Sequence, residues 1–200
     1  MLSMSQGMPR QSTAIACGQS GATPRTLDVG CGRQKVPGTL GLDSVRLPGV
    51  DVVADLVRAG LPFPDGTFGV LHANHLLEHM VDLPAVLAEF HRVCRPGASI
   101  HVLVPYFTCI GAFGDPTHVR FFTYRTLEHF TDDPNDPERH TWFSITRFAI
   151  RRRIGFGKLF RLLGIEWGAN RFPNIYENFF AFLWPARTLS VELIVLADRA

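Results

Sequence analysis

The sequence lacks the features that mark several classes of protein. Its 200 residues include four cysteines, Cys17, Cys31, Cys94 and Cys109, with no CxxC pair and no His/Cys zinc spacing among them. Thiols placed in this way in a mixed α/β sequence indicate reduced side chains and a cytoplasmic protein. No run approaches the roughly 20 apolar residues that a membrane span needs. These absences argue against a disulfide scaffold, a structural zinc module and a transmembrane protein.

The sequence also lacks an excess of charge of one sign. Twenty Lys and Arg face 18 Asp and Glu, which gives a formal net charge of +2. Such a balance does not favour a nucleic-acid binder. One basic run is interleaved with aromatics, and a solvated edge strand explains it as well as an RNA or DNA surface does. That run comprises Arg147, Arg151, Arg152, Arg153, Lys158 and Arg161.

Hydrophobic residues make up 46% of the chain, which is ample for one packed core. The length fits a single domain with a short appendage better than two domains. Residues 1–24 contain no apolar core, and we expect them to form a flexible tail. Residues 25–200 are then the folded domain.

Seven segments have the composition of β-strands, and one helix is well marked. The helix spans residues 83–93, with Asp82 as its cap and Pro84 in its first turn; Arg95-Pro96-Gly97 is expected to end it. The alternation of strands and helical segments predicts a doubly wound α/β fold with a mainly parallel sheet. The expected strands are 25–29, 39–43, 50–55, 68–73, 99–105, 142–151 and 189–197, with 142–151 at an edge or antiparallel.

Three connections depart from the simplest α/β pattern. Nine residues, 30–38, join the first two strands, which is short for a helical crossover and predicts that the first helix has shrunk to a turn. Residues 106–140 form a long insert that we expect to hold one helix near 123–130. The aromatic-rich segment 155–185 is expected to form helices that roof the site.

Acidic residues and glycines recur where the first three strands end. Asp28 is followed by the tight turn of Gly30 and Gly32, whose missing Cβ atoms let the backbone approach a ligand closely. Asp43 ends the second strand, where a carboxylate can accept both hydroxyls of a ribose. Asp55 ends the third strand and can accept from the amino group of an adenine edge. Their succession predicts a nucleoside-binding edge, whereas each feature alone fits a tight turn or a solvated acid.

Four ordered segments resemble the class I S-adenosylmethionine-dependent methyltransferases, especially the small bacterial methyltransferase-domain proteins of the type 11-like branch. The resemblance covers residues 26–106 and implies a seven-stranded sheet with an antiparallel last strand and S-adenosylmethionine as cofactor. It does not indicate the substrate. The four segments are residues 27–32 (LDVGCG), 61–71 (LPFPDGTFGVL), 74–79 (NHLLEH) and 90–97 (FHRVCRPG).

The resemblance also implies roles for individual residues. Gly30, Cys31 and Gly32 would line the methionine part of the cofactor, which Asn74 would also meet. Asp43 would bind the ribose, and Asp55 with Leu56 would hold the adenine. The full set of expected cofactor residues is Asp28, Gly30, Cys31, Gly32, Lys35, Asp43, Asp55, Leu56 and Asn74.

Lys35 is included for a physical reason. A cation just after the glycine turn can pair with the methionine carboxylate and replace the missing helix N-terminus. The sequence departs from the family pattern at Gln34, Gly69 and Ala98, none of which supplies a group needed for cofactor binding.

The insert carries candidate residues for the acceptor side. Asp115 and His118 are the expected catalytic pair, with the imidazole as general base or substrate hook. Arg120 and Tyr124 are expected to hold an anionic or phenolic substrate. A structural Asx turn at Asp115 is an equally good interpretation of the same residues. Three histidines, His72, His75 and His79, suggest a metal cluster, but their spacing is not helical if the first lies in a strand, so we expect no metal site.

Together these features predict a methyltransferase that acts on a small molecule, a glycan or a lipid head group. A non-catalytic cofactor- or partner-binding module of the same fold and an RNA methyltransferase remain alternatives. A dinucleotide-dependent oxidoreductase is disfavoured because the GxGxxG spacing is absent. The sequence leaves the oligomeric state open.

Overall fold

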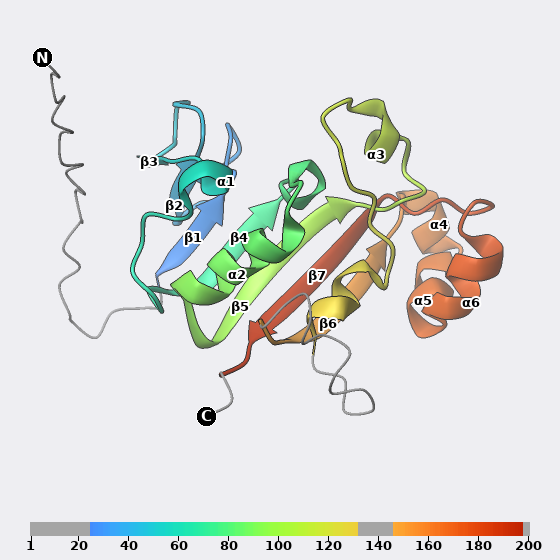
Figure 1. Cartoon of the computed structure of the whole chain (residues 1–200). Coiled ribbons are helices and arrows are strands. Elements are labelled where there is room, and N and C mark those ends of the chain that lie inside the picture. Colours follow the sequence, from blue (N-terminus) through green and yellow to red (C-terminus); the bar gives the residue numbers. More distant parts are fainter. Residues whose placement is uncertain (1–24, 132–145, 198–200) are drawn as a thin grey trace, which may run out of the picture.

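The computed structural model describes residues 25–131 and 146–197 (Figure 1). The expected tail at 1–24 and the beginning of the expected strand at 142–151 lie outside these ranges. None of the helices in the described ranges is long and apolar enough to cross a membrane.

The described residues form one seven-stranded sheet with the order β3-β2-β1-β4-β5-β7-β6. Neighbouring strands from β3 to β5 are parallel, and β7 runs antiparallel to both β5 and β6. The mainly parallel α/β sheet with an antiparallel last strand is thus confirmed. The strands are β1 (Thr26–Val29), β2 (Leu40–Asp43), β3 (Val52–Val53), β4 (Phe68–Asn74), β5 (Cys94–Pro105), β6 (Phe148–Gly155) and β7 (Thr188–Val195).

Three strand boundaries differ from the prediction. β3 keeps only two residues of the expected 50–55. β5 begins at Cys94, so Arg95-Pro96-Gly97 is part of the strand instead of a turn; the register shifts between Phe68 and Val70, and this irregularity accommodates Pro96, which has no N–H. β6 extends to Gly155 because it pairs along its whole length with β7.

One long helix, α2 (Leu83–Val93), covers one face of the sheet (Figure 1). Asp82 Oδ1 accepts a hydrogen bond from Ala85 N at 3.0 Å, and Pro84 lies in the first turn, as predicted. The remaining helical elements are short: α1 (Leu56–Ala59), α3 (Ile110–Gly114), α4 (Lys158–Leu162), α5 (Ile165–Arg171), α6 (Pro173–Ile175), the 3₁₀ helices η1 (Leu77–His79) and η2 (Thr126–Phe130), and the π-helix η3 (Tyr176–Phe180).

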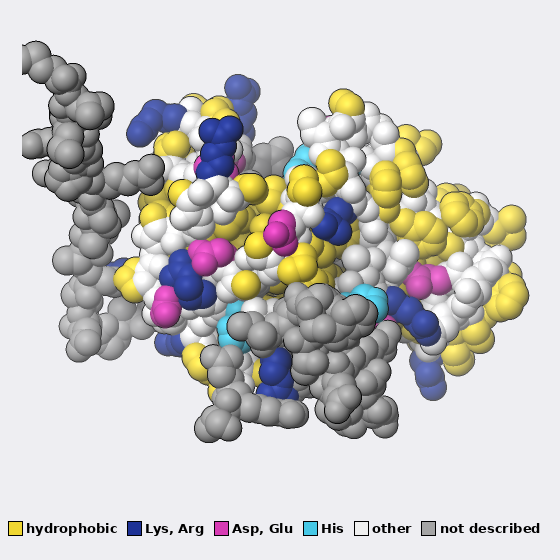
Figure 2. All heavy atoms as spheres, in the orientation of Figure 1, with side chains coloured by type: hydrophobic (Ala, Val, Ile, Leu, Met, Phe, Trp, Pro, Cys, Tyr) yellow, Lys and Arg dark blue, Asp and Glu magenta, His cyan; other side chains and the backbone are white. Residues whose placement is uncertain are grey.

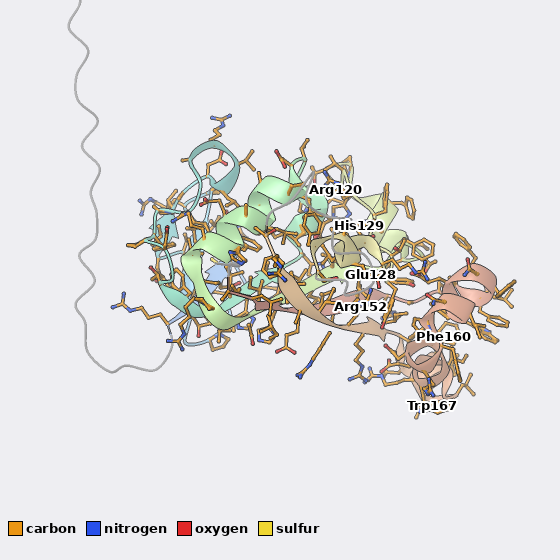
Figure 3. The ribbon with its side chains drawn as sticks, turned by 60° about the horizontal axis from the view of Figure 1, so that its bottom comes forward. Arg120, Glu128, His129, Arg152, Phe160 and Trp167 are labelled. Carbon is orange, nitrogen blue, oxygen red and sulfur yellow. The ribbon has the colours of Figure 1, made fainter. Side chains whose placement is uncertain are left out.

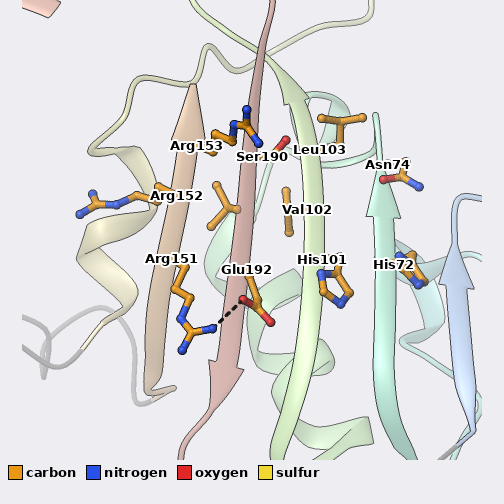
Figure 4. A pocket seen from close by; sticks show the side chains of 11 residues that line it. His72, Asn74, His101, Val102, Leu103, Arg151, Arg152, Arg153, Ser190 and Glu192 are labelled. Carbon is orange, nitrogen blue, oxygen red and sulfur yellow. Dashed lines mark ion pairs between the residues drawn. The ribbon is translucent and has the colours of Figure 1, made fainter. Parts of the chain in front are cut away.

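The face of the sheet away from α2, called here the open face, carries polar side chains. His72, His101, Glu192 and Arg151 are successive register partners on β4, β5, β7 and β6. They line a shallow hollow of about 510 Å³ (Figure 4). The rings of His72 and His101 stack with centroids 5.1 Å apart, and Arg151 pairs with Glu192 at 3.7 Å.

The connection from β1 to β2 contains no helix, as its nine residues predicted. The chain instead folds back in turns, held where Val36 N donates to Asp28 Oδ2 at 2.7 Å. Asp28 pairs with His72 in the sheet register and continues the polar row, but it is buried. The connection from β2 to β3 is also a loop. The helical layer that crossovers of these two strands would supply is therefore absent from the described part of the open face.

The aromatic segment forms α4, α5, α6 and η3, and it leaves the sheet at Gly155 and returns at Thr188, which are register partners. It therefore lies beside the edge strands, at the opposite end of the sheet from β1 to β3 (Figure 1). Hydrophobic side chains gather on its surface (Figure 2), among them Trp167, Phe179 and Phe182, which are 73%, 75% and 82% exposed.

Candidate functional site

A hollow of about 320 Å³ lies where β1, β2, β3 and β4 end, and we call it the β1–β4 hollow. Carboxyl ends of parallel strands are the usual place for ligands in open α/β sheets. Four of the residues predicted to bind the cofactor line it: Gly30, Asp43, Asp55 and Leu56. The lining residues that the sequence analysis did not select are Val29, Leu42, Ser44, Ala54, Val57, His75, Leu76, His79 and Met80.

Gly30 is required by the geometry of the turn after β1. Its φ is +67°, a conformation that L-residues with side chains rarely adopt. A Cβ at this position would lie 2.8 Å from Leu76 Cδ1. The Gly30 amide donates to Leu42 O at 2.8 Å, which fixes the turn against β2. Glycine therefore keeps this wall of the hollow open.

Asp43 and Asp55 hold the backbone around the hollow. Asp43 Oδ2 accepts from Gly32 N at 2.9 Å, and its Oδ1 accepts from Val45 N at 3.0 Å. Each carboxylate oxygen has a second lone pair and can accept a further hydrogen bond from a ligand. Asp55 caps α1, accepting from Val57 N at 3.0 Å.

Three other predicted cofactor residues, Asp28, Lys35 and Asn74, do not line this hollow. Asp28 holds the 30–38 turn through Val36, and its burial raises the pKa of the carboxyl. Lys35 Nζ pairs with Asp51 Oδ2 at 2.8 Å. Asn74 lines the shallow hollow on the open face, beside His72 (Figure 4). The turn of the chain after β4, not its last side chain, therefore reaches the β1–β4 hollow.

The remaining two residues of the glycine turn, Cys31 and Gly32, do not line the hollow either. Cys31 is buried, and its burial raises the pKa of the thiol. Gly32 has a φ of +52°, and its amide is taken by Asp43. The described residues of segment 155–185 do not line this hollow either, so the expected roof does not cover it; the segment is attached to β6 and β7, at the other end of the sheet.

The structure brings Asp115 and His118 near each other, with Asp115 Oδ2 3.9 Å from His118 Nε2. The imidazole is oriented by a different group, because His118 Nδ1 lies 3.0 Å from Ala112 O and donates to it. Asp115 Oδ1 accepts from Thr117 N at 2.9 Å and from Thr117 Oγ1 at 2.6 Å, and these bonds lower the pKa of Asp115. Asp115 therefore forms the Asx turn that was the alternative interpretation.

The two expected substrate residues are held by the protein itself. Arg120 donates to Met80 O at 2.7 Å and to Val81 O. Tyr124 lies under the guanidinium of Arg152, which is 4.1 Å from the centre of its ring. Arg152 also pairs with Glu128 of η2 at 3.1 Å (Figure 3). Arg120 therefore fastens the insert to the chain after η1, and Tyr124 fastens it to β6.

The turn after β4 contributes residues that the sequence analysis did not select for the site. Among the described residues other than glycine, only His75 has a positive φ, which is +53°. Its Nδ1 lies 3.3 Å from Glu78 Oε1, a contact that raises the pKa of His75. The His79 ring lies against that of His118, with centroids 4.7 Å apart. The sequence showed His75 and His79 but not that His118, 39 positions after His79, would join them.

Comparisons with known proteins agree with this architecture. A family model described as a methyltransferase domain matches residues 8–135. No curated protein matches the chain.

Solved structures share the fold at low sequence identity. A SAM-dependent methyltransferase from Archaeoglobus fulgidus aligns with a TM-score of 0.57 and 17% identity, over 86% of each chain. A SAM-dependent methyltransferase from Thermotoga maritima aligns with a TM-score of 0.54 and 13% identity, over 87% of this chain and 83% of that one. Phosphoethanolamine N-methyltransferase 2 of Haemonchus contortus, solved with S-adenosyl-L-methionine, aligns with a TM-score of 0.54 and 11% identity, over 90% of this chain and 50% of that one.

Proposed function

The chain belongs to the methyltransferase-domain family, and on that premise we propose that it transfers a methyl group from S-adenosylmethionine to an acceptor molecule. The β1–β4 hollow carries this proposal, because it joins the glycine turn after β1 to acids after β2 and β3. S-adenosylmethionine, when bound, supplies an electrophilic methyl group on a sulfonium. The work left to the protein is alignment of the acceptor and removal of water.

The groups around the hollow fit a nucleoside. Asp43 has lone pairs to accept from ribose hydroxyls, and Asp55 can accept from an exocyclic amino group. Leu42, Leu56 and Met80 supply apolar contact surface for a purine. The volume lies within the range of about 300–1,000 Å³ that is usual for small-molecule sites. Because Asp28, Cys31, Gly32, Lys35 and Asn74 do not line the hollow, we propose Gly30, Asp43, Asp55 and Leu56 as the main cofactor residues.

The acceptor is proposed to approach beside His79 and His118. The hydrogen bond from His118 Nδ1 to Ala112 O leaves Nε2 with a lone pair that can hold or deprotonate an acceptor. Phe113 and Phe121, which flank this segment, stack with centroids 4.4 Å apart and are 63% and 45% exposed. Exposed aromatics next to a polar centre favour an acceptor that carries an apolar part, so we propose the head group of a lipid as the acceptor.

Calorimetric titration with S-adenosylmethionine and S-adenosylhomocysteine tests the proposal. The wild-type chain should bind both, and Asp43→Ala should bind at least about tenfold more weakly, because a charged hydrogen bond contributes about 1.5–3 kcal/mol. Asp65→Ala is the matched control, since Asp65 is an exposed acid paired with Arg92 outside the hollow. Asp43→Asn retains an acceptor for the Gly32 amide and separates cofactor contact from loop collapse.

Two outcomes would count against the proposal. Absence of binding to the folded wild-type chain would exclude a cofactor site complete within this chain. Equal affinities of Asp43→Ala and Asp65→Ala would exclude Asp43 as the ribose ligand. A parallel titration with NADH should give no binding, because the turn lacks the dinucleotide spacing.

A further inference from the structure

Three side chains near the β1–β4 hollow form a cluster with the composition of a metal site. They are Glu78 and His79 of η1 and His118 of the segment after α3. One candidate ligand atom from each lies within 4.8 Å of those of the other two. Two backbone bonds hold the segments together, since Val119 N and Arg120 N donate to Glu78 O at 2.9 and 3.2 Å. The cluster is therefore built by the fold and is not a chance meeting of mobile surface groups.

The hydrogen bonds of the two imidazoles leave the same nitrogen available on each. His118 Nδ1 donates to Ala112 O, which leaves Nε2 unprotonated in the neutral ring. His79 Nδ1 lies 3.0 Å from Thr117 Oγ1, and that hydroxyl donates its own proton to Asp115 Oδ1. Thr117 Oγ1 must therefore accept from His79 Nδ1, so His79 Nε2 also carries a free lone pair. A backbone carbonyl or a polar group on the far nitrogen is the usual way in which metal-binding histidines are oriented.

Glu78 supplies an independent sign of a missing ligand. Its side chain is 1% exposed, and its Oε1 lies near His75 Nδ1. Its other oxygen, Oε2, is buried and has no hydrogen-bond partner in the described part of the chain. A buried carboxylate oxygen without a donor is costly, and such groups in folded proteins are normally paired with a donor or a cation. A positive ion beside Oε2 would remove this cost.

We propose that Glu78, His79 and His118 bind a divalent first-row transition-metal ion such as Zn²⁺ or Mn²⁺. Imidazole nitrogens favour Zn²⁺ over Ca²⁺ and Mg²⁺, which prefer sites made of oxygen ligands, and the Glu78 carboxylate also suits Mn²⁺. Ligands at about 2.0–2.2 Å from a tetrahedral ion lie roughly 3.3–3.6 Å from one another. Because the ligand atoms lie within 4.8 Å of one another, the side chains would need to draw together by at most roughly 1.5 Å as the ion binds.

The ion would also have a role in methyl transfer. This role rests on the proposed function, whereas the metal site itself does not. His79 lines the β1–β4 hollow, so the ion would lie at its rim. Three protein ligands leave coordination positions open, as in catalytic sites. When bound, the ion would supply Lewis-acid chemistry that makes a hydroxyl acceptor beside it easier to deprotonate. The lone pair of His118 then binds the ion and is not a free base.

Metal titration of the whole chain tests the site. The protein is stripped with a chelator and desalted, then titrated with ZnCl₂ and MnCl₂ by calorimetry, and Mn²⁺ binding is followed by electron paramagnetic resonance. One ion per chain should bind with micromolar or tighter affinity. His118→Ala should weaken binding at least about tenfold, as expected for loss of one of three ligands.

A second variant and a control keep the result interpretable. Glu78→Gln preserves the size of the buried side chain but not its charge, and it should also weaken binding at least tenfold. His101→Ala is the matched control, because this histidine lies on the open face and is not part of the cluster; it should bind like wild type. Thermal unfolding adds a readout, since the metal should raise the midpoint of the wild type and of His101→Ala but not of His118→Ala.

The outcomes separate this inference from the proposed function. Absence of stoichiometric binding, or equal affinity of His118→Ala and wild type, would overturn the metal site. If S-adenosylmethionine still bound in that case, the proposed function would stand without a metal. Metal binding by a chain that does not bind S-adenosylmethionine would keep the site and remove the role assigned to it in methyl transfer.

Discussion

The two faces of the sheet differ although the same strands build both. Leu71, Ile100 and Leu193 are fully buried on the face under α2. Their chain neighbours His72, His101 and Glu192 point to the open face, because successive side chains of a strand alternate between faces. These three residues line the shallow hollow (Figure 4). A single hydrophobic layer therefore carries most of the packing. The connections from β1 to β2 and from β2 to β3 are loops, and the polar row on the open face is compatible with water.

The difference between the faces bears on the candidate site, because that site lies at the carboxyl ends of the strands and not on either face. Gly30, Asp43 and Asp55 stand at strand ends, and their positions depend on the register of β1, β2 and β3. In the described part of the chain, the loops that replace helices between β1, β2 and β3 leave these strand ends in place.

A pair of alanine substitutions tests the difference between the two faces of the sheet. Phe90 of α2 is fully buried, so Phe90→Ala should lower the free energy of unfolding by about 3–5 kcal/mol. His101→Ala on the open face should change it by no more than about 0.5 kcal/mol, as at other surface positions. Urea unfolding followed by circular dichroism measures both. Similar losses for the two variants would mean that the open face is packed in solution.

A second pair of substitutions changes two neighbouring arginines of β6, Arg151 and Arg152. Arg152 donates to Tyr124 O at 2.8 Å, pairs with Glu128 and lies over the Tyr124 ring. Arg152→Ala should therefore cost about 2 kcal/mol, because it removes hydrogen bonds of a charged group and a cation–π contact. Arg151 is 82% exposed and pairs only loosely with Glu192, so Arg151→Ala should cost less than about 0.5 kcal/mol. Equal effects in the same urea experiment would contradict the assignment of the two arginines to different faces.

Much of the fold was accessible from the sequence, because its signals are local. Apolar runs marked β4 and β5, and Asp82 with Pro84 marked the start of α2. The nine-residue length of 30–38 was enough to predict the missing helix. The boundaries of β5 and β6 were not accessible, because they depend on pairing with distant strands.

The residues of the candidate site also fall into those that local sequence could predict and those that depend on distant contacts. Gly30, Asp43 and Asp55 lie at or just after strand ends, so their place at the hollow could be predicted from the chain itself, whereas Leu56 was predicted from the family resemblance. The partner of Lys35 could not, because Asp51 lies 16 positions away and reaches it only through the fold. The cluster of Glu78, His79 and His118 required the docking of the insert on η1, which no local pattern encodes.

The smallest expected effect on the free energy of unfolding is that of Asp28. This residue continues the polar row beneath the 30–38 turn. Burial raises the pKa of this carboxyl, against the opposing effects of the Val36 N–H, His72 and Lys35. The folded state thus holds the proton more tightly than the unfolded chain, whose aspartates titrate near 3.9. The free energy of unfolding should therefore fall as the pH rises from below about 4 through the folded pKa, and it should not change further for this reason above it.

Asp28→Asn isolates this pH dependence, because the amide does not titrate but its oxygen can still accept from Val36 N. Any constant offset between the variants should be about 1 kcal/mol, the usual contribution of one hydrogen bond. The wild type should lose stability relative to Asp28→Asn as the pH rises from 3.5 to 6, measured by urea unfolding at each pH. A difference that stays constant with pH would mean that Asp28 is as well solvated as a surface acid. The 30–38 turn would then fail to shield this end of the polar row, and the open face would extend across the whole sheet.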